Sequence, residues 1–140
     1  GNPIAASLTA KDIILTSGSA RVGAFYETSG QVVDENGTVR AISRNFTNAS
    51  ALGSNQVVPA QGANIRIRVL SAAVIANAAV TVTFLSSATA IGPGMALGIN
   101  GGFVFPHNTH GWFQTETNSA LNLSLGLGLT TGVEVTWIQA

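Results

Sequence analysis

Two histidines in one short loop are the residues of this chain best placed to bind a metal ion. The loop runs Pro106-His107-Asn108-Thr109-His110-Gly111, and Glu116 follows it. Imidazole nitrogens and carboxylate oxygens are common metal ligands. A loop, however, does not hold two rings at a set spacing, as a helix does when its histidines are four residues apart. We therefore interpret the segment as a polar turn with exposed or hydrogen-bonded histidines, and we predict neither a metal nor a cofactor.

Nucleophilic and acid–base groups are sparse. A glycosidase needs two carboxyl groups across one cleft, and the spacing of the six Asp and Glu residues pairs none of them. The chain has no Gly-x-Ser-x-Gly elbow and no cysteine, so neither a hydrolase serine nor a thiolate is indicated. Gly126-Leu127-Gly128 lacks the strand–turn–helix context of a dinucleotide site. The sequence thus predicts a protein that is not an enzyme.

Four arginines are candidates for contacts with another protein. Arg66 and Arg68, followed by Leu70, alternate with apolar residues and so share one face of a predicted strand. Arg40 and Arg44 can be placed on a second segment in the same way. Such charges are usually solvated, and exposed ion pairs stabilise a protein little. Because charge is scarce elsewhere in the chain, we predict contact with a partner or a neighbouring subunit, with a solvated face as the alternative.

Aromatic residues near the C-terminal end suggest a second kind of site. Trp112-Phe113 and Trp137 could form a flat platform for a sugar ring, as in lectins. Large aromatic side chains more often fill the core of a β-sandwich. We predict a core role for them.

The second half of the chain is almost free of charge. No Asp, Glu, Lys or Arg occurs from Val69 to Thr115, and charged residues make up 9% of the chain, against about a quarter in ordinary domains. Polar residues interrupt this span before any apolar run reaches the ~18 residues of a membrane helix. A hydrophobic content of 46% excludes a disordered chain. A net charge of zero argues against nucleic acid as the partner. We expect an oligomer that turns much of this surface toward other protein.

Apolar residues at every second position predict a series of short strands. The clearest segments are Ile65–Leu70, Val80–Leu85, Leu121–Gly126 and Val133–Ile138, with shorter ones at Phe103–Phe105 and Trp112–Thr115. Gly-, Asn- and Pro-bearing turns separate them, and helical spacing never persists. This pattern is typical of an all-β sandwich or barrel.

The N-terminal part has a different composition. Asn36-Gly37 predicts a hairpin turn between two short strands. We place a domain boundary near residue 55, with an N-terminal arm or small β region at 1–54 and a β-sandwich at 55–140. Ile13, Ile14 and Leu15 form an apolar triplet within a small-residue segment. The triplet is either an anchor that binds a partner or the first strand of the sandwich.

From Val57 to the C-terminus the order of features resembles a family of small tailed-phage virion proteins, the capsid decoration or cement proteins. The segments that match are Ile65-Arg66-Ile67-Arg68-Val69-Leu70-Ser71, Ala79-Val80-Thr81-Val82-Thr83-Phe84, Gly101-Gly102-Phe103-Val104-Phe105-Pro106, Gly111-Trp112-Phe113-Gln114-Thr115, Ala120-Leu121-Asn122-Leu123 and the last strand. Residues 1–55 show no pattern that matches.

The resemblance implies a jelly-roll-like antiparallel β-sandwich that forms a homotrimer on the outer surface of a bacteriophage head. Its partner would be the major capsid protein, whose neighbouring capsomers it clamps. No signal peptide is visible, so we expect synthesis in the host cytoplasm. Neither membrane nor nucleic acid is expected as a partner. Two alternatives stay open: a trimeric receptor- or carbohydrate-binding head of a phage fibre, and a bacterial lectin-like or TNF-like module.

Overall fold

The computed structural model describes residues 27–28 and 30–140, which belong to two compact units, Gly1–Ile42 and Ser43–Ala140. Ile13, Ile14 and Leu15 lie outside the described residues. The described part of the chain is built from strands and contains no helix that could cross a membrane. The all-β prediction is therefore confirmed.

The first unit contains a small antiparallel sheet of β1 (Glu27–Thr28), β2 (Gln31–Val33) and β3 (Val39–Ala41). The predicted hairpin turn lies between β2 and β3. Gly37 has a φ of 82°, a left-handed conformation that favours glycine. The Asp34 carboxylate accepts hydrogen bonds of 2.9 Å from the backbone N–H groups of Asn36 and Thr38, which tie the turn together.

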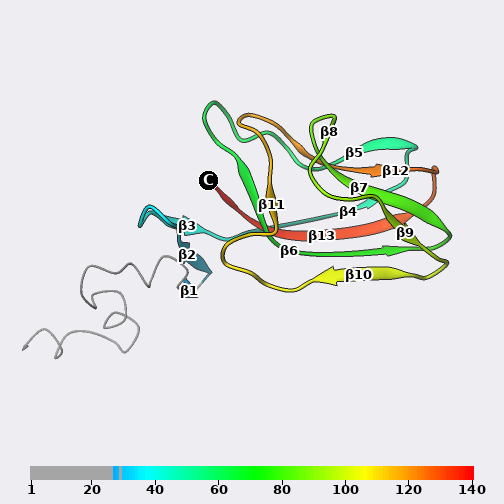
Figure 1. The fold of residues 1–140 in the computed structure, drawn as a ribbon, viewed down its shortest axis with the longest axis horizontal. Coiled ribbons are helices and arrows are strands. Elements are labelled where there is room, and N and C mark those ends of the chain that lie inside the picture. Colours follow the sequence, from blue (N-terminus) through cyan, green and yellow to red (C-terminus); the bar gives the residue numbers. More distant parts are fainter. Residues whose placement is uncertain (1–26, 29) are drawn as a thin grey trace, which may run out of the picture. The chain divides into compact units, whose positions relative to one another are not determined.

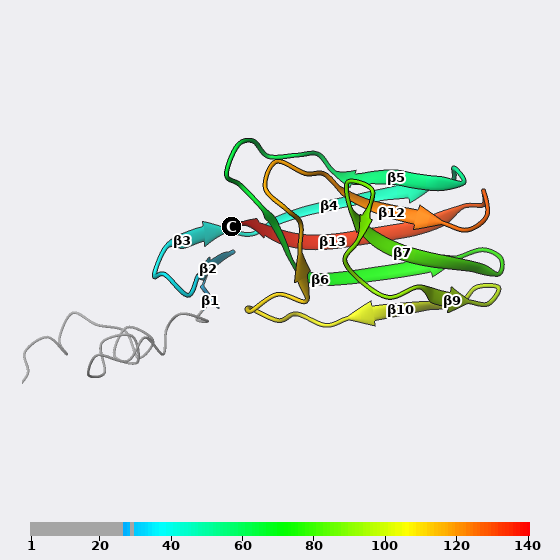
Figure 2. The ribbon, with the colours of Figure 1, turned by 45° about the horizontal axis from the view of Figure 1, so that its top comes forward.

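The second unit is an antiparallel β-sandwich (Figures 1 and 2). One sheet has the order β10-β6-β13-β4, with β11 also paired to β6; the other has the order β5-β12-β7-β8, with β9 also paired to β7. The strands are β4 (Ser43–Ala49), β5 (Gly53–Val58), β6 (Ile67–Ala76), β7 (Val80–Ser86), β8 (Thr89–Ala90), β9 (Met95–Leu97), β10 (Gly102–Phe105), β11 (Phe113–Gln114), β12 (Leu121–Leu125) and β13 (Thr131–Gln139).

The pairings in the sandwich are nested along the chain. β4 pairs with β13, β5 with β12, β6 with β10 and β7 with β9, all antiparallel. Two further pairings, β6 with β13 and β7 with β12, join these pairs into the two sheets. The sandwich is thus a long hairpin of paired strands folded over on itself.

The inward faces of both sheets supply one apolar core. Leu121, Leu123 and Leu125 of β12 point into it, as their alternation predicted, and Asn122 and Ser124 lie on the opposite face. Phe84 of β7 is fully buried opposite Leu123.

Leu70 departs from the predicted alternation. It was expected on the same face as Arg66 and Arg68, but it is fully buried. Val69 lies opposite Trp137, whereas Ser71 lies opposite Thr136, so the register of β6 against β13 shifts at Leu70. A β-bulge of this kind adds one residue to a strand and reverses which positions face inward. Alternation alone does not reveal such an insertion.

The domain boundary also differs from the prediction. The structure divides the chain after Ile42, not near residue 55. β4 pairs with β13 along seven positions and β5 pairs with β12, so the residues from Ser43 onward belong to the sandwich. β4 is an edge strand whose alternate residues face water, so its sequence is rich in polar residues. For this reason the sequence did not indicate that β4 belongs to the sandwich.

Candidate functional site

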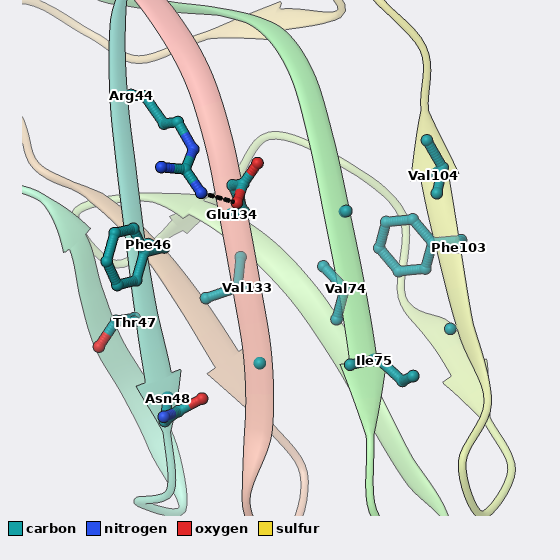
Figure 3. A pocket seen from close by; sticks show the side chains of 13 residues that line it. Arg44, Phe46, Thr47, Asn48, Val74, Ile75, Phe103, Val104, Val133 and Glu134 are labelled. Carbon is teal, nitrogen blue, oxygen red and sulfur yellow. Dashed lines mark hydrogen bonds and ion pairs between the residues drawn. The ribbon is translucent and has the colours of Figure 1, made fainter.

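The outer face of the sheet β4–β13–β6–β10 exposes large apolar side chains. Phe46 on β4, Ile75 on β6 and Val104 on β10 are 69%, 59% and 69% exposed. Exposed apolar residues scattered singly are ordinary, but a group of them on one face is typical of an interaction surface. These three gather around one depression, so we treat this face as the candidate site (Figure 3).

The register of the four strands sets the residues of this face in rows. One row contains Asn48, Gly132, Ile75 and Gly102. The next contains Phe46, Glu134, Ala73 and Val104. The large apolar side chains are therefore separated along the rows, by Gly132 in the first row and by Glu134 and Ala73 in the second. We call the shallow depression of about 810 Å³ over these rows the outer-face groove.

The two glycines of the groove are there for different reasons. A Cβ at Gly102 would lie 2.2 Å from the Val74 carbonyl oxygen, so the fold itself requires glycine. A Cβ at Gly132 would meet nothing closer than Ile75 Cγ2, at 3.5 Å, which is ordinary contact. Glycine inside a strand costs stability and often marks close approach of a ligand or another backbone. No contact among the described residues requires glycine at position 132, so we attribute Gly132 to the open space above it.

One ion pair lies at the rim of the groove. Arg44 Nη2 donates a hydrogen bond of 2.5 Å to Glu134 Oε2, and the Arg44 guanidinium lies 5.1 Å from the centre of the Phe46 ring. The hydrogen bond raises the pKa of Arg44 and lowers that of Glu134. The two charges cancel, so the groove presents an apolar surface of zero net charge.

The other predicted arginines do not join this site. Arg40 Nε lies 3.1 Å from Asp34 in the first unit. Arg66 lies 3.3 Å from Glu116, and Arg68 Nε donates to Gln114 Oε1 at 3.2 Å. Each arginine thus has a partner within its own chain, and of the four only Arg44 borders the groove. Whether any of them also contacts another protein stays a prediction.

The histidine loop and the two tryptophans lie apart from the groove lining, and the core role predicted for Trp112 is wrong. Within residues 30–140, no three His, Asp or Glu side chains come close enough to hold a metal ion, and both His107 and His110 are exposed. Trp137 is buried in the core and donates from Nε1 to Asn45. Trp112 is 43% exposed and stacks on Phe105, with ring centres 5.0 Å apart. The two tryptophans therefore do not form one platform.

Sequence reasoning missed the outer-face groove, although two signals were present. Gly132 stands inside an otherwise regular strand, which is a recognised sign of close approach. The run from Ala72 to Ala76 is apolar on both faces, which an antiparallel strand with a solvated side would not need.

No family model, curated protein or solved structure matches this chain. Its fold and its surface are therefore the grounds for a functional proposal.

Proposed function

We propose that this protein is a non-enzymatic virion structural protein: a capsid decoration protein that forms homotrimers on the outer surface of a phage head. It binds the major capsid protein and stabilises the head by joining neighbouring capsomers. The nested pairing of the strands across two sheets supports the jelly-roll-like sandwich that this function implies, since a jelly roll is a double-sheet fold.

The observation that favours this proposal most is the outer-face groove. Phe46, Ile75 and Val104 are exposed around a groove whose two charged lining residues, Arg44 and Glu134, form an ion pair. A protein that works alone would place such side chains in contact with water, at a cost in solubility. In an oligomer the same side chains lie against a second protein surface. A structural subunit therefore uses a surface that an isolated domain would avoid.

Assembly on a lattice fits the small size of the sandwich. One copy offers a limited contact area, but three linked copies bind several sites at once and gain effective concentration. Ile13, Ile14 and Leu15 are the proposed capsid anchor, since an apolar triplet in a small-residue segment can bind a groove or add a strand to a partner.

The proposal is tested by adding purified protein to capsids that lack it. We expect low-resolution electron microscopy to show extra density at regular positions on the head surface, and the decorated heads to survive higher temperature. Density confined to a tail tip, or no binding at saturating protein, would contradict the proposal.

A carbohydrate-binding head is the second candidate, and Phe46 is the observation that favours it. Its exposed ring lies on β4 between Arg44 and Asn48, so an aromatic face has hydrogen-bonding groups on both sides. A glycan array followed by Phe46→Ala distinguishes the two functions. Specific glycan binding that the substitution abolishes would favour the receptor-binding role over decoration.

A further inference from the structure

We propose that the outer-face groove of one copy receives the edge strand β10 of a second copy, so that groove and edge close a ring. This inference rests on the oligomer of the proposed function and names the two surfaces that meet. It follows from the glycine in the groove, the free edge of β10, the chemistry of Asn48 and the symmetry of a ring.

Gly132 indicates that an occupant comes close to the sheet. The position tolerates a Cβ without strain, yet the groove floor has only a hydrogen atom there. Its neighbour in the row, Ile75, stands 59% exposed between Gly132 and Gly102. Contact with solvent alone does not require gaps on both sides of Ile75. The side chains of an approaching strand would fit into the gaps above Gly132 and Gly102.

β10 is the strand best suited to be the occupant. It is the end strand of its sheet within the described residues, paired only with β6. Its sequence Gly102-Phe103-Val104-Phe105 has no charge, and Val104 is exposed. Edge strands usually have charges or a bulge that prevent pairing with another chain. The free edge of β10 has neither, so it is open to contact.

Asn48 gives the groove a group that matches a strand edge. Its side chain is exposed in the same row as Gly132 and makes no hydrogen bond with the described part of the chain. A carboxamide has both donors and an acceptor, as a peptide group does. The free N–H and C=O groups of β10 need such partners when they leave water.

Ring symmetry favours β10 over the other exposed apolar residues. Contacts in a ring are heterologous, so the groove must meet a surface other than itself, and the unpaired backbone edge of β10 is such a surface although its Val104 also lines the groove. Rotation about an axis along the strands keeps each residue at its own height. Val104 and Phe46 share one row, so β10 of the neighbour lies level with the groove. Leu52, Ile99 and Leu127 instead lie in the turns beyond the strand ends.

The contact area explains why the ring should close. Four strands about 4.8 Å apart and five residues of about 3.3 Å each give a face of roughly 250 Å². A stable interface buries about 800 Å² per partner. A single groove–edge contact falls well short of this, whereas the two contacts per copy in a closed ring bury roughly 500 Å² and come closer to it, so closure is favoured over an open pair. We therefore expect closed rings without a populated open pair.

Cysteine pairing tests the contact directly, because the chain has no cysteine of its own. In the double variant Phe46→Cys, Val104→Cys the two cysteines lie on the end strands of the path β4-β13-β6-β10, about 14 Å apart at ordinary strand spacing. A disulfide spans less than about 7 Å between Cα atoms, so any bond joins two copies. Mild oxidation should give covalent trimers, and each single variant should stay uncrosslinked.

Filling the groove gives the second measurement. Gly132→Val should raise the concentration at which the oligomer dissociates by at least tenfold, with an unchanged circular dichroism spectrum. Ser124→Val is the matched control, since it places the same side chain on the outer face of the other sheet. Leu127→Ser is the control for the turns.

The outcomes separate this inference from the proposed function. Dimers from either single cysteine variant would indicate a two-fold contact and overturn the β10 assignment. An oligomer that resists Gly132→Val and forms no crosslink, or one that Leu127→Ser dissociates instead, would overturn it while leaving the decoration function standing. A wild-type chain that stays monomeric both in solution and on the capsid would refute both.

Discussion

Leu123 of β12 lies directly opposite Phe84 of β7, and both side chains are fully buried. The pair lies in the core between the two sheets, where a lost methyl group leaves a cavity. Leu123→Ala should therefore lower the free energy of unfolding by about 2–5 kcal/mol. Denaturant unfolding measures the change, and Ser124→Ala on the opposite face is the control. A loss below about 0.5 kcal/mol would show that Leu123 is not a core residue.

The two groove glycines should respond in opposite ways to alanine. Gly102→Ala places a Cβ against the Val74 carbonyl and should cost about 1–3 kcal/mol, as overpacking does. Gly132→Ala has room for its Cβ and should stabilise the sandwich by about 0.4–1 kcal/mol, since it restricts the unfolded chain. Unfolding of dilute protein compares the two variants. Equal losses at both positions would mean that the fold, not a partner, requires Gly132.

Asp34 should make the β2–β3 hairpin sensitive to acid. Burial alone raises its pKa, but hydrogen bonds from Thr38, Arg40 and Asn36 outweigh burial and hold the pKa below its ordinary value. Ionised Asp34 therefore stabilises the hairpin above the unfolded pKa near 4, and this contribution is lost as the pH falls through the lower folded pKa.

NMR signals of the hairpin, followed from pH 7 to 2, measure this loss. Asp34→Asn should remove the pH dependence and destabilise the hairpin by about 1.5–3 kcal/mol, the range for hydrogen bonds to a charged group. Glu35→Gln is the control at the neighbouring, exposed position. An unchanged acid transition in Asp34→Asn would exclude this carboxylate as its cause.

Removing residues 1–20 should leave the sandwich folded but weaken its attachment to capsids. Ser43–Ala140 form a compact unit with their own core, so the melting temperature should change little. Loss of Ile13, Ile14 and Leu15 removes the proposed anchor. Co-sedimentation with stripped capsids measures attachment. Normal melting with undiminished binding would leave the segment without an anchoring role, and a much lower melting temperature would indicate that it belongs to the folded core.

Much of the fold was predictable because alternation is a local property. Leu121, Leu123 and Leu125 predict a strand and its buried face without any knowledge of the partner strands, since successive side chains point to opposite faces. The Asn36-Gly37 turn is similarly local, because glycine favours the left-handed conformation that the turn requires. These features follow from a few neighbouring residues, and the sequence alone was enough to predict them.

The remaining features depend on residues far apart in the chain. Leu70 is buried because β6 shifts its register against β13, and Ser43–Ala49 belong to the sandwich because they pair with that same strand. Phe46, Ile75, Val104 and Gly132 form one surface because four strands bring them into adjacent rows. Pairing over such distances is decided by which arrangement of both sheets buries the most apolar surface. Only the tertiary structure could therefore assemble the outer-face groove.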